Sequence, residues 1–265
     1  MRLGSIASGS SGNCIYIGSD HTHILVDTGI SKKRIEEGLA AYELSPKDLD
    51  GIFITHEHID HISGLGVLTR KYPVPIYATK ETIYGIRQTK SLGALDKSLF
   101  VEIEPEEDVT VGDLTVHPFS ISHDALNPVA YTVTDGEKKA AVATDMGRFD
   151  KKTVDRLTGM NCMLVEANHD IHMLETGSYP YPLKVRIAGD HGHLSNDAAG
   201  DLINQVLNPD LKYIFLGHLS RENNYPQLAW ETVRLNINTA DTPYRASDFD
   251  LRVASRTEAG EAVEF

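Results

Sequence analysis

Short runs of β-branched and aromatic residues, bounded by turn residues, recur along the whole chain. These runs predict strands over Arg2–Ala7, Cys14–Gly18, Ile24–Asp27, Gly51–Thr55, Phe100–Ile103, Leu114–Phe119, Val129–Val133, Lys139–Ala143, Cys162–Val165 and Tyr213–Leu216. Apolar positions at helical spacing predict helices over Gly64–Tyr72, Glu81–Thr89, Ser195–Gln205 and Pro226–Asn236. Ser31 offers an N-cap to a further helix, with Ile35 and Leu39 on one face. Strands interleaved with helices in both halves predict an α/β fold of two packed sheets with helices on their outer faces.

No internal repeat, low-complexity tract or linker divides the 265 residues, so we expect a single domain over residues 1–265. No apolar stretch is long enough for a signal peptide or a membrane span. Cys14 and Cys162 lack the spacing of a metal site or a disulfide framework. We therefore expect a cytoplasmic protein without membrane association.

The net charge of −13 argues against a broad nucleic-acid-binding face, which needs clustered Lys and Arg. The acidic stretch Glu102–Asp108 is most simply a solvated loop. A nucleic-acid substrate is still compatible with this charge, because two bound divalent cations would reverse the local field at an active site. No Walker or dinucleotide fingerprint is present, so we expect no nucleotide cofactor.

The segment Thr55–His61 reads THEHIDH and follows an apolar run directly. Three imidazoles and a carboxylate so close together would need partners if buried. A divalent metal resolves this by accepting their nitrogen and oxygen lone pairs. Imidazole and carboxylate without thiolate point to zinc, manganese or iron rather than to a closed structural zinc site.

Three further candidate ligands each lie just past a predicted strand: His123, Asp145 and His218. Rigid scaffolds hold functional groups in such places. Taken singly, either histidine is more often an ordinary residue than a ligand. In this order after HxHxDH, they predict a shared metal centre.

The HxHxDH pattern with the later His, Asp and His resembles the metallo-β-lactamase superfamily. The resemblance implies an αβ/βα sandwich of two mixed sheets flanked by helices. It also implies two metal ions, for which the donors would be His56, His58 and His123 at one ion, Asp60, His61 and His218 at the other, and Asp145 as the bridge. Every ligand position is filled in this sequence, which favours a catalytic member.

A closer resemblance covers nearly the whole chain. The segments SIASGSSGNC, LVDTGIS, VATDMG, EANHD, GHLSN and GHLS are similar to those of the YycJ/WalJ group, which is related to the tRNase Z-type nucleases. This resemblance implies a DNA exonuclease. His61 stands where true lactamases usually have another residue, which points to phosphodiesters or thioesters as substrates.

For the mechanism we expect a metal-bridging hydroxide that attacks phosphorus and is oriented by Asp60. Glu166 and His193 resemble the pair that tRNase Z-type enzymes use near the leaving group, so His193, with Glu166 behind it, is the expected general acid. The alternative is that His193 only packs near the helix that starts at Ser195. His169 and His191 compete for the same role.

Candidate substrate contacts come from two regions. The loop Ser8–Asn13 could hydrogen-bond a phosphate through Ser8, Ser10 and Asn13, support the metal loops, or simply form a hairpin turn. Asn196 in GHLSN is a further candidate, as are Ser220 and Arg221 after the last ligand; Arg221 is equally well explained by a surface salt bridge.

Two other functions remain as alternatives. A small-molecule phosphodiesterase or thioesterase would suit the acidic surface better than a nuclease. The second alternative is a metal-binding regulatory module without turnover, and the complete ligand set argues against it. A tRNA-processing role is disfavoured, because Glu175–Lys184 is too short for a tRNA-gripping arm; Tyr179 and Tyr181 there could stack on a base or form a lid. Homodimers are common in the superfamily, but the sequence leaves the oligomeric state open.

Overall fold

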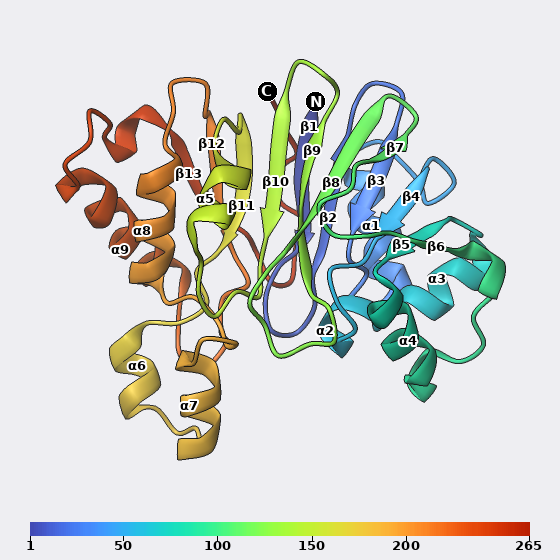
Figure 1. Ribbon diagram of the computed structural model, residues 1–265, viewed down its shortest axis with the longest axis horizontal. Coiled ribbons are helices and arrows are strands. Elements are labelled where there is room, and N and C mark those ends of the chain that lie inside the picture. The colour runs from blue at the N-terminus through green and yellow to red at the C-terminus, as the bar shows by residue number, and fades with distance from the viewer.

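Most of the predicted strands are apolar along their length, which is typical of strands covered on both faces. In the computed structural model, which describes residues 1–265, they form two seven-stranded sheets packed face to face (Figure 1). In spatial order the first sheet contains β14 (Val263–Glu264), β1 (Arg2–Ala7), β2 (Cys14–Gly18), β3 (His23–Val26), β4 (Gly51–Phe53), β5 (Ile76–Ala78) and β6 (Phe100–Glu102). The second contains β13 (Asp250–Val253), β12 (Tyr213–Gly217), β11 (Cys162–Glu166), β10 (Lys139–Ala143), β9 (Val129–Thr134), β8 (Leu114–Ser120) and β7 (Val109–Val111).

Both sheets combine an antiparallel meander with parallel strands. Strands β1 to β3 and β7 to β10 pair antiparallel. Strands β3 to β6 and β10 to β13 pair parallel. The carboxyl ends of β8, β10, β11 and β12 therefore meet at one edge of the second sheet, where loop-borne side chains can converge.

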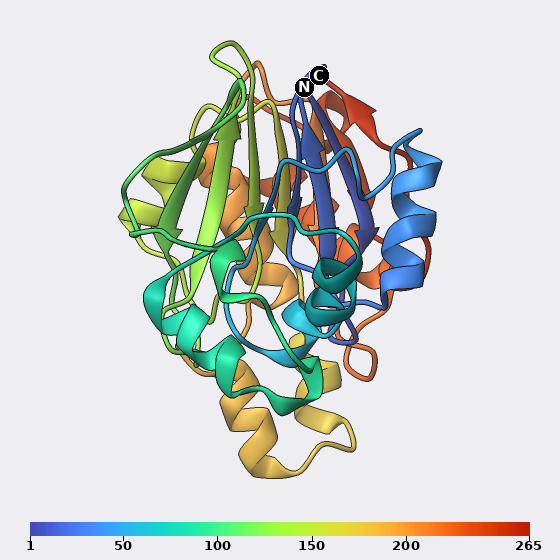
Figure 2. The same cartoon turned by 90° about the vertical axis from the view of Figure 1, so that its right-hand side faces the viewer.

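Helices cover the outer face of each sheet (Figures 1 and 2). On the side of the first sheet lie α1 (Lys32–Ala41), α2 (Ile59–Ile62), α3 (Leu65–Lys71), α4 (Lys80–Gln88) and the 3-10 turns η1 (Lys90–Leu92) and η2 (Lys97–Leu99). On the side of the second lie α5 (Lys151–Leu157), α8 (Asn196–Val206), α9 (Pro226–Thr239) and η3 (Ala246–Asp248). The short helices α6 (Ile171–Thr176) and α7 (Tyr181–Ala188) project beyond the sheets, at the lower left of Figure 1.

Three apolar clusters form the core. The one between the sheets includes Phe53, Tyr131 and Leu164, and one further cluster lies under the helices of each sheet. Phe53 stacks on Tyr77 with ring centroids 4.5 Å apart and meets Tyr131 edge-on at 5.5 Å. Buried aromatic pairs of this kind hold facing sheets in a fixed relation, so the loops at the sheet edge start from rigid positions.

The predicted sandwich of two mixed sheets flanked by helices is confirmed. The sequence pattern missed β5, β7, β13 and β14, which are at most four residues long, and the helices α2 and α5 to α7. Such short elements carry too few residues to show a period. No helix of the structure is long and apolar enough to cross a membrane.

Candidate metal centre

Every residue of the predicted ligand set lies past a strand end at the same edge of the sandwich. His56, His58, Asp60 and His61 follow β4, and α2 begins within this segment. His123, Asp145 and His218 follow β8, β10 and β12. Asp145 and His218 adopt positive φ angles of 62° and 54°, and such backbone in non-glycine residues costs about 1–3 kcal/mol each. Strained backbone that the surrounding fold maintains is typical of functional sites.

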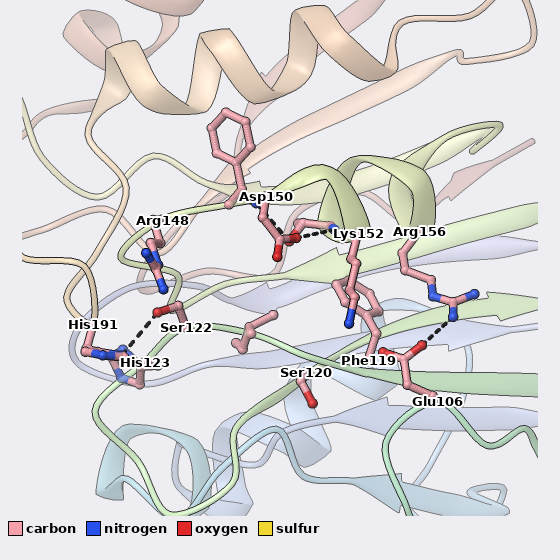
Figure 3. Close-up of a pocket in the computed structure, with 13 residues that line it drawn as sticks. Glu106, Phe119, Ser120, Ser122, His123, Arg148, Asp150, Lys152, Arg156 and His191 are labelled. Atoms are coloured by element: carbon pink, nitrogen blue, oxygen red, sulfur yellow. Dashed lines mark hydrogen bonds and ion pairs between the residues drawn. The ribbon is translucent and has the colours of Figure 1, made fainter.

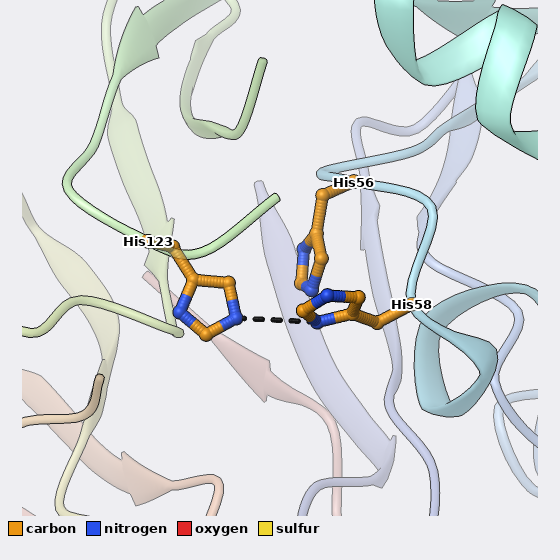
Figure 4. A group of neighbouring side chains, drawn as sticks. All are labelled: His56, His58 and His123. Atoms are coloured by element: carbon orange, nitrogen blue, oxygen red, sulfur yellow. Dashed lines mark hydrogen bonds between the residues drawn. The ribbon is translucent and has the colours of Figure 1, made fainter. Parts of the chain in front are cut away.

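The first group of potential ligands is purely imidazole. One nitrogen each from His56, His58 and His123 lie within 4.8 Å of one another (Figure 4). The Nε2 atom of His123 is 3.3 Å from Nδ1 of His58. The Nε2 atom of His56 is buried and has no hydrogen-bond partner. Three inward-facing nitrogens, one of them unpaired, match the donors that a divalent metal accepts.

The second group contains Asp60, His61 and His218, again within 4.8 Å. The Oδ2 atom of Asp60 is 3.6 Å from Nε2 of His61 and 3.4 Å from Nε2 of His218. Asp145 lies between the groups: its Oδ2 is 3.2 Å from Nε2 of His61, and its Oδ1 is 3.8 Å from Nε2 of His123. Its buried Oδ2 has no hydrogen-bond partner, so the residue has the place and the free lone pair of a bridging ligand.

A second layer of hydrogen bonds orients each imidazole. Nδ1 of His61 lies 2.7 Å from Oδ2 of Asp27. Nδ1 of His218 lies 2.8 Å from Oε1 of Glu166. That of His123 lies 3.0 Å from the carbonyl oxygen of Gly192. Each of these three rings therefore uses Nδ1 within the protein and turns Nε2 toward the centre, the usual arrangement behind metal-binding histidines.

Asp27 is a supporting residue to which sequence analysis gave no role. Its buried carboxylate accepts hydrogen bonds from the backbone N–H of Thr55 at 2.9 Å and from the Thr55 hydroxyl, besides contacting His61. Asp27 also has a positive φ of 62°. A charged residue directly after an apolar strand was the available sequence signal.

Glu166 and His193 lie together beside this centre. Glu166 is fully buried and accepts the backbone N–H groups of Met146 at 2.9 Å and Leu194 at 3.1 Å through Oε2. Its Oε1 lies 2.8 Å from Nδ1 of His193, whose side chain keeps 13% of its surface exposed. No hydrogen bond within the chain engages Nε2 of His193, so this nitrogen can face a ligand.

The electrostatics of the cluster favour bound cations. Burial opposes the charged form of His218, but nearby carboxylates, led by that of Asp145, outweigh it and raise the pKa of this imidazole to about 10. The same balance raises the pKa of His61 well above its usual value. Burial would raise the pKa of Asp145, yet the imidazoles around it hold that pKa well below the usual range. The buried carboxylates thus require positive charge, and the donor set of imidazole and carboxylate fits divalent metal ions.

The other candidate histidines have different surroundings. His169 is buried, and burial lowers its pKa to about 4. His191 is exposed, with Nδ1 3.1 Å from the hydroxyl oxygen of Ser122. Neither is hydrogen-bonded to Glu166, which separates both from the pair described above.

The six candidate substrate residues divide into buried and exposed sets. Ser8, Asn13, Asn196 and Ser220 are at most 4% exposed. The Ser8 hydroxyl oxygen accepts the backbone N–H of His218 at 2.8 Å, and the Asn13 amide nitrogen lies 3.2 Å from Nε2 of His61. Ser8 and Asn13 therefore contact the loops that carry His218 and His61. Asn196 is bonded to the buried amide of Asn224, while Ser10 and Arg221 face solvent.

The fold and the site together define a metal-dependent hydrolase built on a two-sheet sandwich. The chain belongs to the β-lactamase superfamily: the family described as "Beta-lactamase superfamily domain" matches residues 22–216. It is 41% identical over 241 residues to Exodeoxyribonuclease WalJ of Streptococcus pneumoniae, covering 91% of this chain and 90% of that protein. It is 39% identical to Exodeoxyribonuclease YycJ of Bacillus anthracis over 229 residues, 86% of each chain.

Solved structures agree with this fold. The metallo-β-lactamase fold protein YhfI of Bacillus subtilis superposes with a TM-score of 0.71 at 17% identity, and the match covers 100% of this chain and 99% of that one. At this identity the likeness shows the fold alone, so the chemistry has to be argued from the side chains of this protein.

Proposed function

We propose that this protein is a DNA exonuclease that depends on two divalent metal ions. The observation that carries the proposal is the convergence of two three-residue donor groups with Asp145 between them. Imidazole and carboxylate donors suit zinc, manganese or iron. Support for DNA as the substrate comes from the two exodeoxyribonuclease relatives, which match the chain over most of its length. Because DNA is the proposed substrate, we expect the protein to act in the cytoplasm.

In this proposal His56, His58 and His123 would hold one ion, Asp60, His61 and His218 would hold the other, and Asp145 would serve both. When bound, such a pair of ions would supply Lewis acidity for phosphodiester hydrolysis. Asp60 has a partly exposed carboxylate at the centre and so can orient the attacking water and accept its proton.

His193 delivers a proton to the leaving oxygen. Its Nδ1–H donates to Oε1 of Glu166, which fixes the ring orientation and leaves Nε2 as the atom that holds the transferable proton. Burial raises the pKa of Glu166, but the adjacent His193 imidazole and the hydrogen bonds with His193 and His218 outweigh burial and lower that pKa to about 2. An ionised Glu166 in turn favours the protonated form of His193.

The proposal is tested with metal-reconstituted protein on double-stranded DNA labelled at the 5′ or the 3′ end. Progressive shortening from one end is expected, and it should disappear in His58→Ala. His172→Ala is the matched control, because that side chain is 90% exposed and outside the cluster. If the protein cleaves a small phosphodiester but not DNA, the metal site belongs to a small-molecule phosphodiesterase. If it hydrolyses neither substrate, a regulatory module is favoured.

A further inference from the structure

A pocket of about 410 Å³ adjoins the metal centre and shares His123 with it (Figure 3). One wall is the end of β8 with the residues that follow it, and the other is the start of α5 with the segment before it. His191 lies at the same end as His123, 3.1 Å from the Ser122 hydroxyl. The volume lies within the range of pockets that hold a ligand the size of a nucleotide.

Three cationic side chains line this pocket, namely Arg148, Lys152 and Arg156. They are unexpected in a chain whose net charge is −13. In Figure 3 they extend from the α5 side toward the β8 side, where Ser120 and Ser122 lie. Lysine and arginine next to hydroxyl groups are the side chains that contact phosphate oxygens in nucleic-acid complexes.

The carboxylates of the pocket are already engaged. Glu106 pairs with Arg156. Asp150 caps α5 by accepting the backbone N–H of Thr153 at 3.0 Å. Two of the three cations are consequently available to an anion.

Lys152 forms no ion pair within the chain, and Arg148 has only Asp190 at 3.5 Å. The side chains of Arg148 and Asp190 are 63% and 72% exposed, so water screens this contact and it contributes little. A phosphate that enters the pocket can therefore contact Lys152 and Arg148 without displacing a strong ion pair.

We propose that this pocket binds the DNA substrate strand next to the scissile bond. Lys152 and Arg148 contact phosphates of that strand, and the Ser120 hydroxyl donates a hydrogen bond to a phosphate oxygen of the same strand. The inference rests on the proposed nuclease function and adds the path that the strand takes away from the metal centre. The shared residue His123 places the pocket directly beside the centre, as a strand that runs from one to the other requires.

The test compares Lys152→Glu and Arg148→Glu with Lys151→Glu. Lys151 lies on the same helix, is exposed and does not line the pocket, so it carries the same charge change to a different face. Steady-state rates on single-stranded and double-stranded DNA are measured over a series of salt concentrations. For each pocket variant the KM is expected to rise about tenfold with kcat little changed. The slope of log KM against log salt concentration should fall by about one for each phosphate that the variant no longer binds.

Lys152 lies in the first turn of α5, where a glutamate is compatible with the helix, and the side chain of Arg148 is exposed ahead of that helix, so both pocket variants should keep the wild-type melting temperature. A KM and a salt slope that match those of Lys151→Glu in DNA-degrading protein would overturn the pocket assignment and leave the nuclease function intact. If the wild-type protein degrades no DNA, the nuclease function fails, and fluorescence anisotropy of a labelled oligonucleotide then decides the pocket. Weaker binding in Lys152→Glu than in Lys151→Glu supports it, and equal binding refutes it.

Discussion

The change Gly29→Ala tests how rigidly the loop after β3 holds the metal-ligand segment. An added Cβ at Gly29 would lie 1.6 Å from the carbonyl oxygen of Asp60 and 2.2 Å from its carbonyl carbon. The two segments are also joined by backbone hydrogen bonds, from Thr28 N–H to the His61 carbonyl at 2.8 Å and from Gly64 N–H to the Thr28 carbonyl at 2.8 Å. The clash is with backbone, so no side-chain rotation relieves it.

The size of the displacement follows from these distances. Side-chain Cβ atoms essentially never come closer than 3.0 Å to such neighbours, and 3.0 Å minus 1.6 Å requires a shift of at least 1.4 Å. Asp60 and His61 are both proposed ligands of one ion, so the shift moves two of its three terminal donors. A misplacement of about 1 Å at a reacting centre costs about 100-fold in rate. Overpacking alone costs about 1–3 kcal/mol of stability.

The assay combines three measurements on the same preparation: metal content by mass spectrometry, kcat/KM on bis(p-nitrophenyl) phosphate, and the melting temperature. We expect Gly29→Ala to bind less metal than the wild-type protein and to lose about 100-fold in kcat/KM. Gly260→Ala is the control, because its added Cβ would meet only the Ser5 carbonyl oxygen at 3.8 Å, an ordinary contact. Full metal content and unchanged kcat/KM in Gly29→Ala would show that the loop after β3 does not hold the ligand segment in place.

Three further predictions concern the same centre. Asp27→Asn removes the carboxylate that orients His61, so the affinity for the ion held by His61 should fall about 10- to 100-fold in a chelator competition; an unchanged affinity would exclude the orienting role. His193→Gln should keep the metal content but lower kcat on DNA about 100- to 10,000-fold. The loss should be smaller on a p-nitrophenyl phosphodiester, because its leaving group needs no proton. An equal loss of kcat on both substrates would contradict general acid catalysis. Chelation leaves His61 and His218 protonated near pH 7, because both pKa values are raised, that of His218 to about 10. Rebinding of metal must then release protons and strengthen as pH rises from 7 toward 10, and titration calorimetry in buffers of different ionisation enthalpy should detect the release; binding heats independent of the buffer would count against it.

Local patterns were sufficient for the elements whose residues carry their own signal. Strands such as β10 and β11 are apolar runs bounded by turns, and their covered faces follow from composition alone. The segment β13 (Asp250–Val253) was not predicted, because it is only four residues long and its place in the sheet depends on parallel pairing with β12. The helices α6 and α7 were missed for a related reason: they project from the body and bury too little surface to leave an apolar stripe in the sequence.

The residue types and their order along the chain were enough to indicate the chemistry of the centre. Imidazoles and carboxylates that repeatedly follow apolar strands indicate the donors, because a strand end fixes which residues leave the sheet together. Only the three-dimensional structure shows how those donors are held: Asp27 lies behind His61, Glu166 lies behind His218 as well as His193, and Gly29 packs against the Asp60 carbonyl. It also brought Lys152 and Arg148 to the side of His123. These contacts join residues that belong to different strands and loops, and no local period or motif encodes them, since only the packing of the two sheets sets their distances.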